Sequence, residues 1–256
     1  MSEPILEAHK LSRTFGDFIA VEEASFTLYP GEIVGFLGPN GAGKTTTIKM
    51  LTGLLGPSSG VARVAGFDMA QSPLEAKARI GYVPDTPNLY GKLKAQEYLR
   101  FVGQLYKVPP DQVEARIRPM LDIFDLTDVA GNYLDTFSHG MQQKVAIIGA
   151  FLHDPQIVFM DEPTVGLDPR SARLIKDLMI RHRDGGGTIF FSTHILEIAQ
   201  TMCDRVIIIN KGRIVADAQV SEMRRMRGDQ SLEDIFLELT GGRDVDELVK
   251  ELEDGG

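Results

Sequence analysis

The sequence predicts an α/β fold with a mainly parallel sheet at its core, and three observations support this prediction. Short runs of β-branched and apolar residues alternate with segments of helical periodicity along the chain, a pattern typical of α/β proteins. A glycine-rich loop, Gly38–Lys44, stands between one such run and a helical segment. With 256 residues, of which 43% are hydrophobic, the chain can bury a sizeable core without disulfides or structural metals.

The predicted elements follow one another in a regular order. Strands are expected at residues 32–37, 61–65, 79–83, 156–160, 188–192, 205–210 and 213–215. Helices are expected at residues 45–55, in two segments between 94 and 124 that Pro109-Pro110 separates, from the N-cap Ser138 to about Leu152, and at residues 172–183. Proline, glycine and capping residues set their limits. An acidic tail, residues 241–256, has apolar residues at helical spacing and is expected to form a short amphipathic helix.

The composition argues against several classes of protein. A formal net charge of −9 and a pI of about 5.1 disfavour a nucleic-acid partner, because such binders usually present a basic face. The single cysteine, Cys203, cannot form an intrachain disulfide, which excludes a disulfide-stapled secreted scaffold. The longest apolar run, Val145–Leu152, is far shorter than the ~18 residues needed to span a bilayer. Any membrane role is therefore expected to come through a partner.

The glycine-rich loop fits the phosphate-binding pattern G-x-x-x-x-G-K-[ST]. The residues expected to contact a nucleotide are Gly38, Pro39, Asn40, Gly41, Ala42, Gly43, Lys44, Thr45 and Thr46. Glycines let backbone N–H groups curl around phosphates, the lysine reaches the β and γ oxygens, and the Thr45 hydroxyl can bind Mg²⁺. A flexible loop without a ligand is the alternative. It is disfavoured because the loop leads into a helix, whose N-terminus attracts anions.

Two acids, Asp161 and Glu162, follow the strand predicted at residues 156–160. Ligands of parallel sheets bind at the carboxyl ends of strands, so this position suits a site. Asp161 is expected to hold Mg²⁺ through water, and Glu162 to orient and deprotonate an attacking water. Taken alone, acidic residues at the end of an apolar strand usually mark only the point where the strand reaches solvent. The phosphate loop in the same chain favours the catalytic interpretation.

Four further motifs occur in a fixed order along the chain. They are Phe15, Phe137-Ser138-His139-Gly140-Met141, Gly166-Leu167-Asp168 and Ser192-Thr193-His194. In that order they resemble the adenine-stacking aromatic residue, the signature sequence L-S-G-G-Q, the D-loop and the switch histidine of ABC-type ATPases, the nucleotide-binding subunits of ABC transporters. The resemblance covers nearly the whole chain. It implies a P-loop NTPase core with an antiparallel β subdomain and an inserted α-helical subdomain at about residues 86–153, all within a domain of residues 1–240.

The resemblance also implies a composite site, in which two such domains meet head to tail with ATP between one phosphate loop and the partner's signature. Ser138 and Gly140 would then contact the partner's γ-phosphate at a helix N-terminus, and His194 would donate to the γ-phosphate. Asp168 would brace the partner's site. Phe15 would stack on adenine, and because stacking reads no base edge, ATP and GTP should be poorly discriminated. For each residue taken alone, a structural role is the alternative.

Three residues depart from the family pattern. The signature has His139 where glycine is usual and Met141 where glutamine is usual, and Asp85 stands where the family places the glutamine of the Q-loop. An ionised aspartate is shorter than glutamine and can only accept hydrogen bonds. The expected Mg²⁺ ligands are Thr45 and Asp161. Asp85 is expected to bind Mg²⁺ or to hold a water molecule next to it, and a mainly structural role is the alternative for Asp85.

These features predict an ATP-binding and ATP-hydrolysing subunit, with Lys44, Glu162 and His194 as the catalytic residues, ATP as substrate and Mg²⁺ as cofactor. The resemblance implies two partners. One is a second ATP-binding subunit, which is expected to be a second copy of this chain. The other is an integral membrane transporter subunit that holds the chain at the cytoplasmic face of the membrane. One rival is a soluble ABC-type ATPase acting on DNA or ribosomes, which the acidic charge disfavours. Another is a nucleotide-gated regulatory subunit, which the presence of Glu162 and His194 disfavours.

The helical stretch after Asp85 resembles the subdomain that receives the coupling helices of the membrane partner. The residues that could line such a groove are Leu89, Tyr90, Leu93, Tyr98 and Phe101. Ordinary helix packing is the alternative for each of them. The Pro84-Asp85 pair and the segment Leu232–Leu239 are similar to stand-alone subunits of bacterial exporters of drugs, lipids, ions or peptides, which favours export over import.

Overall fold

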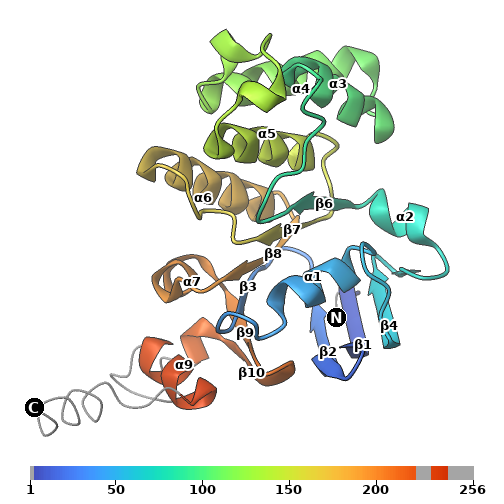
Figure 1. The fold of residues 1–256 in the computed structure, drawn as a ribbon, viewed down its shortest axis with the longest axis vertical. Coiled ribbons are helices and arrows are strands. Elements are labelled where there is room, and N and C mark those ends of the chain that lie inside the picture. The colour runs from blue at the N-terminus through green and yellow to red at the C-terminus, as the bar shows by residue number, and fades with distance from the viewer. Residues whose placement is uncertain (1–2, 223–231, 242–256) are drawn as a thin grey trace, which may run out of the picture.

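The computed structural model describes residues 3–222 and 232–241, and it has the predicted α/β architecture. Figure 1 shows a central sheet with a second, antiparallel sheet below it and a layer of helices above it. The helix predicted for the tail lies outside the described residues, apart from Gly241. Within the described ranges, every helix is too short or too polar to pass through a bilayer.

A six-stranded sheet forms the centre of the molecule, in the order β10-β9-β3-β8-β7-β6. Its strands are β3 (Ile33–Leu37), β6 (Ile80–Val83), β7 (Ile157–Asp161), β8 (Thr188–Thr193), β9 (Arg205–Asn210) and β10 (Arg213–Gln219). Neighbouring strands from β9 to β6 are parallel, and β10 pairs antiparallel with β9. The mainly parallel core predicted from the sequence is therefore confirmed.

Both faces of the strands at the centre of this sheet are buried. In β3, Ile33 and Leu37 belong to the hydrophobic cluster on the side of the helical layer, while Val34 and Phe36 belong to the cluster shared with the antiparallel sheet. All residues of β3 and β7 are buried. Strands covered on both faces are nearly continuous apolar runs, which is why the sequence predicts them well. They form a rigid support for the loops that follow their carboxyl ends.

A four-stranded antiparallel sheet has the order β2-β1-β4-β5. Its strands are β1 (Leu6–Phe15), β2 (Phe18–Leu28), β4 (Ser59–Val64) and β5 (Phe67–Asp68). The motif analysis by itself locates only β4. In β1 and β2 the register shifts repeatedly, and Lys10 and Glu23 have φ of 48° and 47°, as residues at β-bulges do. These bulges disrupt the alternation of apolar and polar residues that would otherwise mark the two long strands.

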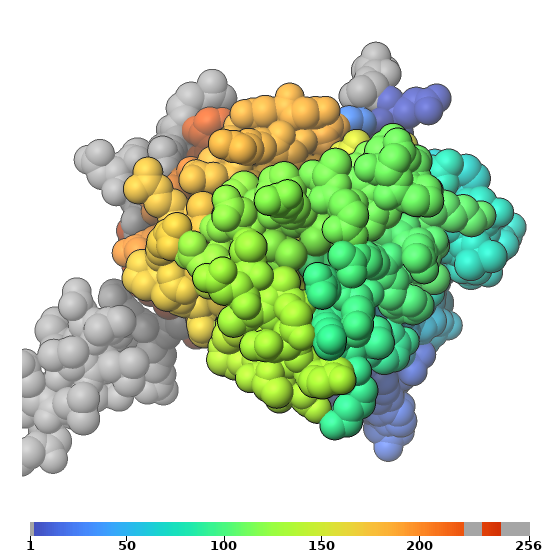
Figure 2. All heavy atoms as spheres, turned by 90° about the horizontal axis from the view of Figure 1, so that it is seen from above, coloured from blue at the N-terminus to red at the C-terminus, as the bar shows by residue number. Residues whose placement is uncertain are grey.

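The helices lie around the two sheets. They are α1 (Lys44–Leu51), α2 (Pro73–Lys77), α3 (Ala95–Leu105), α4 (Pro110–Ile123), α5 (His139–Phe151), α6 (Pro169–Asp184), α7 (Leu196–Met202) and α9 (Leu232–Thr240), with 3₁₀ turns at Thr127–Val129 and Leu134–Thr136. Of these, α3, α4 and α5 form the layer above the central sheet (Figure 1). Figure 2, seen from above, shows that the segment with α3, α4 and α5 (green) covers most of that end of the molecule. The two helices predicted on either side of Pro109-Pro110 are confirmed as α3 and α4.

Two helix limits differ from the prediction by three residues or more. Helix α1 ends at Leu51 and not at Leu55, because Gly53 has a φ of +66°, a left-handed conformation that ends helices. Helix α6 begins at Pro169, three residues before the predicted Ala172. The side chain of Asp168 caps it by accepting a hydrogen bond of 2.9 Å from the Ser171 amide, and such a cap satisfies a free donor at the helix N-terminus.

Candidate functional site

The glycine-rich loop connects the buried strand β3 to helix α1 at the carboxyl edge of the central sheet. Two of its glycines have neighbours that exclude a side chain. A Cβ at Gly38 would lie 2.4 Å from the carbonyl oxygen of Ile209, and a Cβ at Gly43, where φ is +109°, would lie 2.6 Å from the carbonyl oxygen of Ala20. Only glycine therefore allows the loop to pack this closely against β9 and β2 while its amides stay available to a ligand.

A cavity of about 340 Å³ lies over this loop. Its lining residues are Phe18, Ala20, Asn40, Gly41, Gly43, Lys44, Thr45, Thr46, Asp85 and Glu162. The structure thus brings most of the predicted loop residues together with Asp85 and Glu162, which are 77 positions apart in the sequence (162 − 85). Gly38, Pro39 and Ala42 belong to the loop but do not line the cavity.

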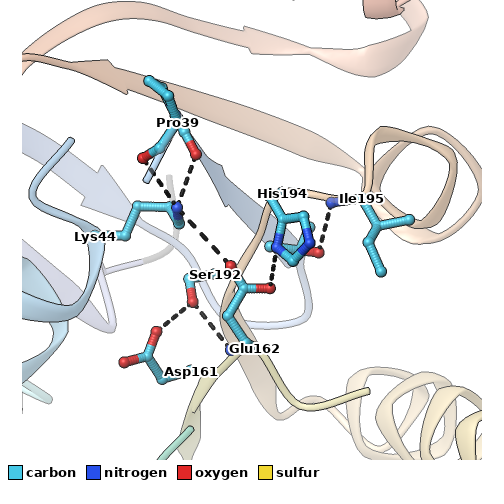
Figure 3. Close-up of polar contacts among 9 residues, drawn as sticks. Pro39, Lys44, Asp161, Glu162, Ser192, His194 and Ile195 are labelled. Atoms are coloured by element: carbon cyan, nitrogen blue, oxygen red, sulfur yellow. Dashed lines mark hydrogen bonds and ion pairs between the residues drawn. The ribbon is translucent and has the colours of Figure 1, made fainter. Parts of the chain in front are cut away.

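The Lys44 side chain is buried, with a relative exposure of 7%. Its Nζ donates to the carbonyl oxygen of Gly38 at 2.7 Å and to that of Pro39 at 3.3 Å, and it lies 3.8 Å from Oε1 of Glu162 (Figure 3). Burial lowers the pKa of Lys44, and the nearby carboxylates of Glu162 and Asp161 oppose this shift. The lysine thus sits between the loop and the acids, where an anionic ligand would meet it.

Asp161 ends strand β7 and is 1% exposed. Its Oδ1 accepts a hydrogen bond of 2.5 Å from the hydroxyl of Ser192, a residue of the neighbouring strand β8. Its Oδ2 is buried and has no hydrogen-bond partner among the described residues. A buried carboxylate oxygen without a partner is costly, so this atom suits a ligand that supplies positive charge.

Glu162 follows Asp161 in a left-handed backbone conformation, with a φ of 49°, which is uncommon for residues other than glycine. Its Oε2 lies 3.0 Å from Nδ1 of His194, and Figure 3 shows the two side chains facing each other. Because an ionised carboxylate only accepts hydrogen bonds, the Nδ1–H of His194 is the donor. The Glu162 side chain is 14% exposed and that of His194 is 52% exposed. The predicted base and switch histidine are thus in direct contact.

The signature and the D-loop lie next to each other. A Cβ at Gly140 would lie 3.4 Å from the Leu167 side chain. Ser138 is the N-cap of α5, where its hydroxyl accepts from the Met141 amide at 3.3 Å. The hydroxyl and amide of Ser171 both donate to Asp168 and lower the pKa of its carboxyl to about 2. Both segments lie outside the set of residues that line the cavity.

The two aromatic residues near the β1–β2 turn have different surroundings. Phe15 is 47% exposed, and the Arg13 guanidinium lies 4.6 Å from the centre of its ring. Phe18 is 64% exposed and is the aromatic residue that lines the cavity. Stacking of Phe15 on adenine remains a prediction. Sequence reasoning missed Phe18 because it did not locate the hairpin that carries it.

Asp85 reaches the cavity from the segment that follows β6. The carbonyl oxygen of Pro84 just before it accepts a hydrogen bond of 3.3 Å from Nε2 of Gln143. Gln143 belongs to α5 and is 1% exposed. The segment is therefore tied to the helix that begins at the signature.

The arrangement defines a P-loop nucleotide-binding domain, since the phosphate loop leaves β3, the acidic pair leaves β7, and β8 lies between them with His194 at its end. The chain belongs to the ABC transporter family, whose family model matches residues 21–165. It is an ATP-binding subunit of an ABC transporter and a member of a family that hydrolyses ATP.

Relatives of known name support this assignment over most of the chain. The ABC transporter ATP-binding protein NatA of Bacillus subtilis is 39% identical over 85% of this chain and 89% of its own length. The Nod factor export ATP-binding protein I of Paraburkholderia xenovorans is 35% identical over 87% of this chain and 73% of its own length. A solved structure of the ATP binding subunit of an ABC transporter has a TM-score of 0.88 and 36% identity, covering 92% of this chain and 99% of that chain.

Proposed function

We propose that this subunit dimerises head to tail on ATP and drives export through a separate membrane subunit at the cytoplasmic face. The head-to-tail dimer is proposed because two sets of predicted site residues are separated from each other within one chain. Ser138 and Gly140 do not line the cavity that holds Lys44, Thr45 and Glu162. They lie at the exposed N-terminus of α5, where amides favour an anion. A second chain can bring its own signature to this cavity.

Oxygen atoms of the cavity lining, together with Asp161 next to the lining residue Glu162, suit Mg²⁺, a cation that prefers oxygen ligands. The Thr45 hydroxyl and the Asp85 carboxylate line the cavity, and Oδ2 of Asp161 is a buried oxygen without a partner among the described residues. Bound Mg²⁺ would neutralise charge on the phosphate oxygens. Thr45, Asp85 and Asp161 are proposed to hold it, the last two directly or through water.

Side chains and backbone amides of this chain have the other roles in ATP binding and hydrolysis. Lys44 binds the β and γ oxygens of ATP, and the loop amides surround the phosphates. Glu162 orients a water and accepts its proton. His194, which the structure holds against Glu162 at 3.0 Å, contacts the γ-phosphate and fixes the position of the base.

Replacement of Asp85 by asparagine is expected to raise the Mg²⁺ concentration needed for half-maximal ATP hydrolysis about tenfold, a typical effect of weakening a metal's surroundings. The amide keeps the shape of the side chain but removes its charge. The measurement is an ATPase assay over a Mg²⁺ titration, with Asp111→Asn, an exposed change at the start of α4, as the matched control. An unchanged titration and turnover would assign Asp85 a structural role.

An apolar groove is proposed as the docking surface for the membrane subunit. This groove of about 800 Å³ lies between the end of α1, strand β6 and helices α3 and α5. Its lining residues include Leu54, Tyr82, Pro84, Leu89, Tyr90, Tyr98, Phe101, Leu105 and His153. Of the residues expected there, Leu93 does not line it. Tyr90 is 63% exposed and Leu105 64%, and an exposed apolar patch of this kind marks an interaction site.

The Tyr90→Arg variant tests this surface. We expect it to lose the membrane subunit on affinity purification from native membranes, because a buried guanidinium without a partner is costly, while ATP hydrolysis by the isolated chain stays unchanged. Leu74→Arg is the matched control, since Leu74 is 79% exposed on α2 and lies outside the groove. Mass spectrometry of the captured membrane protein identifies the partner. Equal capture by both variants would contradict the docking surface.

Export is proposed over import on two grounds. The Pro84-Asp85 pair and the segment Leu232–Leu239 are similar to those of stand-alone exporter subunits, and one relative is named for export of Nod factor. Inside-out membrane vesicles, which carry the subunit on their outer surface, would test the direction of transport. Export predicts that ATP drives accumulation of a substrate in the vesicle interior.

A further inference from the structure

Ser192 is a buried hydroxyl that contacts both acids of the site. It lies in β8 directly opposite Asp161 of β7 in the parallel register, and it is 0% exposed. Its Oγ is 2.5 Å from Oδ1 of Asp161 and 3.1 Å from the amide nitrogen of Glu162. Figure 3 shows the hydroxyl between the two acids. A single oxygen atom thus connects two residues that have different proposed tasks.

The direction of these hydrogen bonds follows from the groups involved. An ionised carboxylate has no proton to donate, so the Ser192 hydroxyl donates to Asp161. The lone pairs of the same oxygen accept the N–H of Glu162. The two bonds form a chain from the Glu162 amide through the hydroxyl to the Asp161 carboxylate, and bonds in such a chain strengthen each other.

The chain of hydrogen bonds has a separate consequence for each acid. For Asp161, it occupies Oδ1 and leaves Oδ2 as the buried oxygen without a partner among the described residues. For Glu162, it holds the amide of a residue whose φ is 49°, and the carbonyl oxygen of Ser192 accepts from the same amide at 3.2 Å. A strained backbone persists only where its neighbours hold it.

We propose that Ser192 is a positioning residue that fixes Asp161 for Mg²⁺ and Glu162 for the attacking water. This inference rests on the roles proposed above for the two acids. Hydrogen-bond partners of metal ligands orient the ligand, and their loss typically weakens metal binding or activity roughly 10–100-fold.

The Ser192→Ala variant tests the proposal with two measurements. Binding of Mn²⁺ to the protein with saturating ADP, followed by electron paramagnetic resonance, is expected to weaken about tenfold. The ATPase assay is expected to show kcat reduced roughly 10–100-fold with KM nearly unchanged. ADP affinity in EDTA should stay within about twofold of wild type, because Lys44 and the loop amides are intact. If the alanine variant does not fold, Ser192→Cys, which keeps the size but hydrogen-bonds weakly, takes its place.

Three further variants separate the possible outcomes. Thr188→Val removes another fully buried hydroxyl from the same strand, one that donates to the Tyr29 carbonyl at 3.0 Å, and should leave Mn²⁺ affinity unchanged. Ser192→Thr keeps a hydroxyl and should restore much of the Mn²⁺ affinity. Asp161→Asn should lose that affinity. If Asp161→Asn binds Mn²⁺ normally, the role proposed for Asp161 is wrong. If Asp161→Asn loses Mn²⁺ and Ser192→Ala does not, the inference about Ser192 is wrong.

Discussion

Replacement of Glu162 by glutamine is expected to lower the rate of ATP hydrolysis roughly 10²–10⁴-fold while ATP still binds. The amide oxygen can still accept the hydrogen bond that His194 donates to Oε2 at 3.0 Å, so the geometry of the pair is kept. The amide cannot take a proton from water, so the chemical step is lost. An ATPase assay measures the rate, and binding of a fluorescent ATP analogue measures affinity.

The same variant should accumulate as a dimer. ATP that is bound but not hydrolysed would stay between the two chains, so size-exclusion chromatography with ATP should show the dimer and chromatography with ADP the monomer. Glu75→Gln, an exposed change on α2, is the control and should behave as wild type in both assays. Hydrolysis at the wild-type rate by Glu162→Gln would show that Glu162 is not the base.

Mixing two inactive variants is expected to restore part of the ATPase activity. Lys44→Ala removes the buried cation of the phosphate loop, and Ser138→Arg places bulk and charge at the N-terminus of α5, where the partner's γ-phosphate would dock. Each homodimer should therefore be inactive. In the mixed dimer, the loop of the Ser138→Arg chain faces the intact signature of the Lys44→Ala chain, which gives one complete site. The second site carries both defects.

The result of mixing distinguishes shared from separate sites, provided that heterodimers are shown independently, for example by two affinity tags. If each chain used its own signature, no mixture would contain a complete site. Failure of the heterodimer to hydrolyse ATP would count against a shared site, or would require that both sites act together. The separation of Ser138 from the cavity within one chain favours recovery.

The parts of the fold that the sequence predicts well are those in which one local signal dominates. Strands β3 and β7 are buried on both faces, so their apolar runs are continuous. The phosphate loop is a short motif in which the glycines have steric roles, Lys44 has a charged role and the Thr45 hydroxyl can bind a metal. The long strands β1 and β2 were missed because their bulges break the alternation. The end of α1 was placed too late because Gly56-Pro57 is the stronger stop signal in the sequence, whereas the helix ends before Gly53, which takes a left-handed conformation.

The parts of the site that depend on neighbouring strands were not predictable in the same way. Ser192 is visible in the sequence as part of the segment before His194, but its contact with Asp161 depends on the register of β8 against β7. The available signal was a polar residue at the end of the predicted strand 188–192, and Thr188 at the other end of that strand is polar too. The place of Phe18 in the cavity lining depends on how close a hairpin turn lies to the phosphate loop. That loop is distant in the sequence, and a single sequence carries no local sign of the distance between them.

Strand β6 and the residues after it line both the apolar groove and the nucleotide cavity. Tyr82 lines the apolar groove, Asp85 lines the nucleotide cavity, and α5 holds Pro84 between them through Gln143. Three residues of extended chain span about 10 Å. If ATP and the membrane subunit both shift this segment, their binding free energies are coupled, and the coupling is reciprocal. The factor by which the membrane subunit changes the affinity for ATP must then equal the factor by which ATP changes the affinity for the membrane subunit.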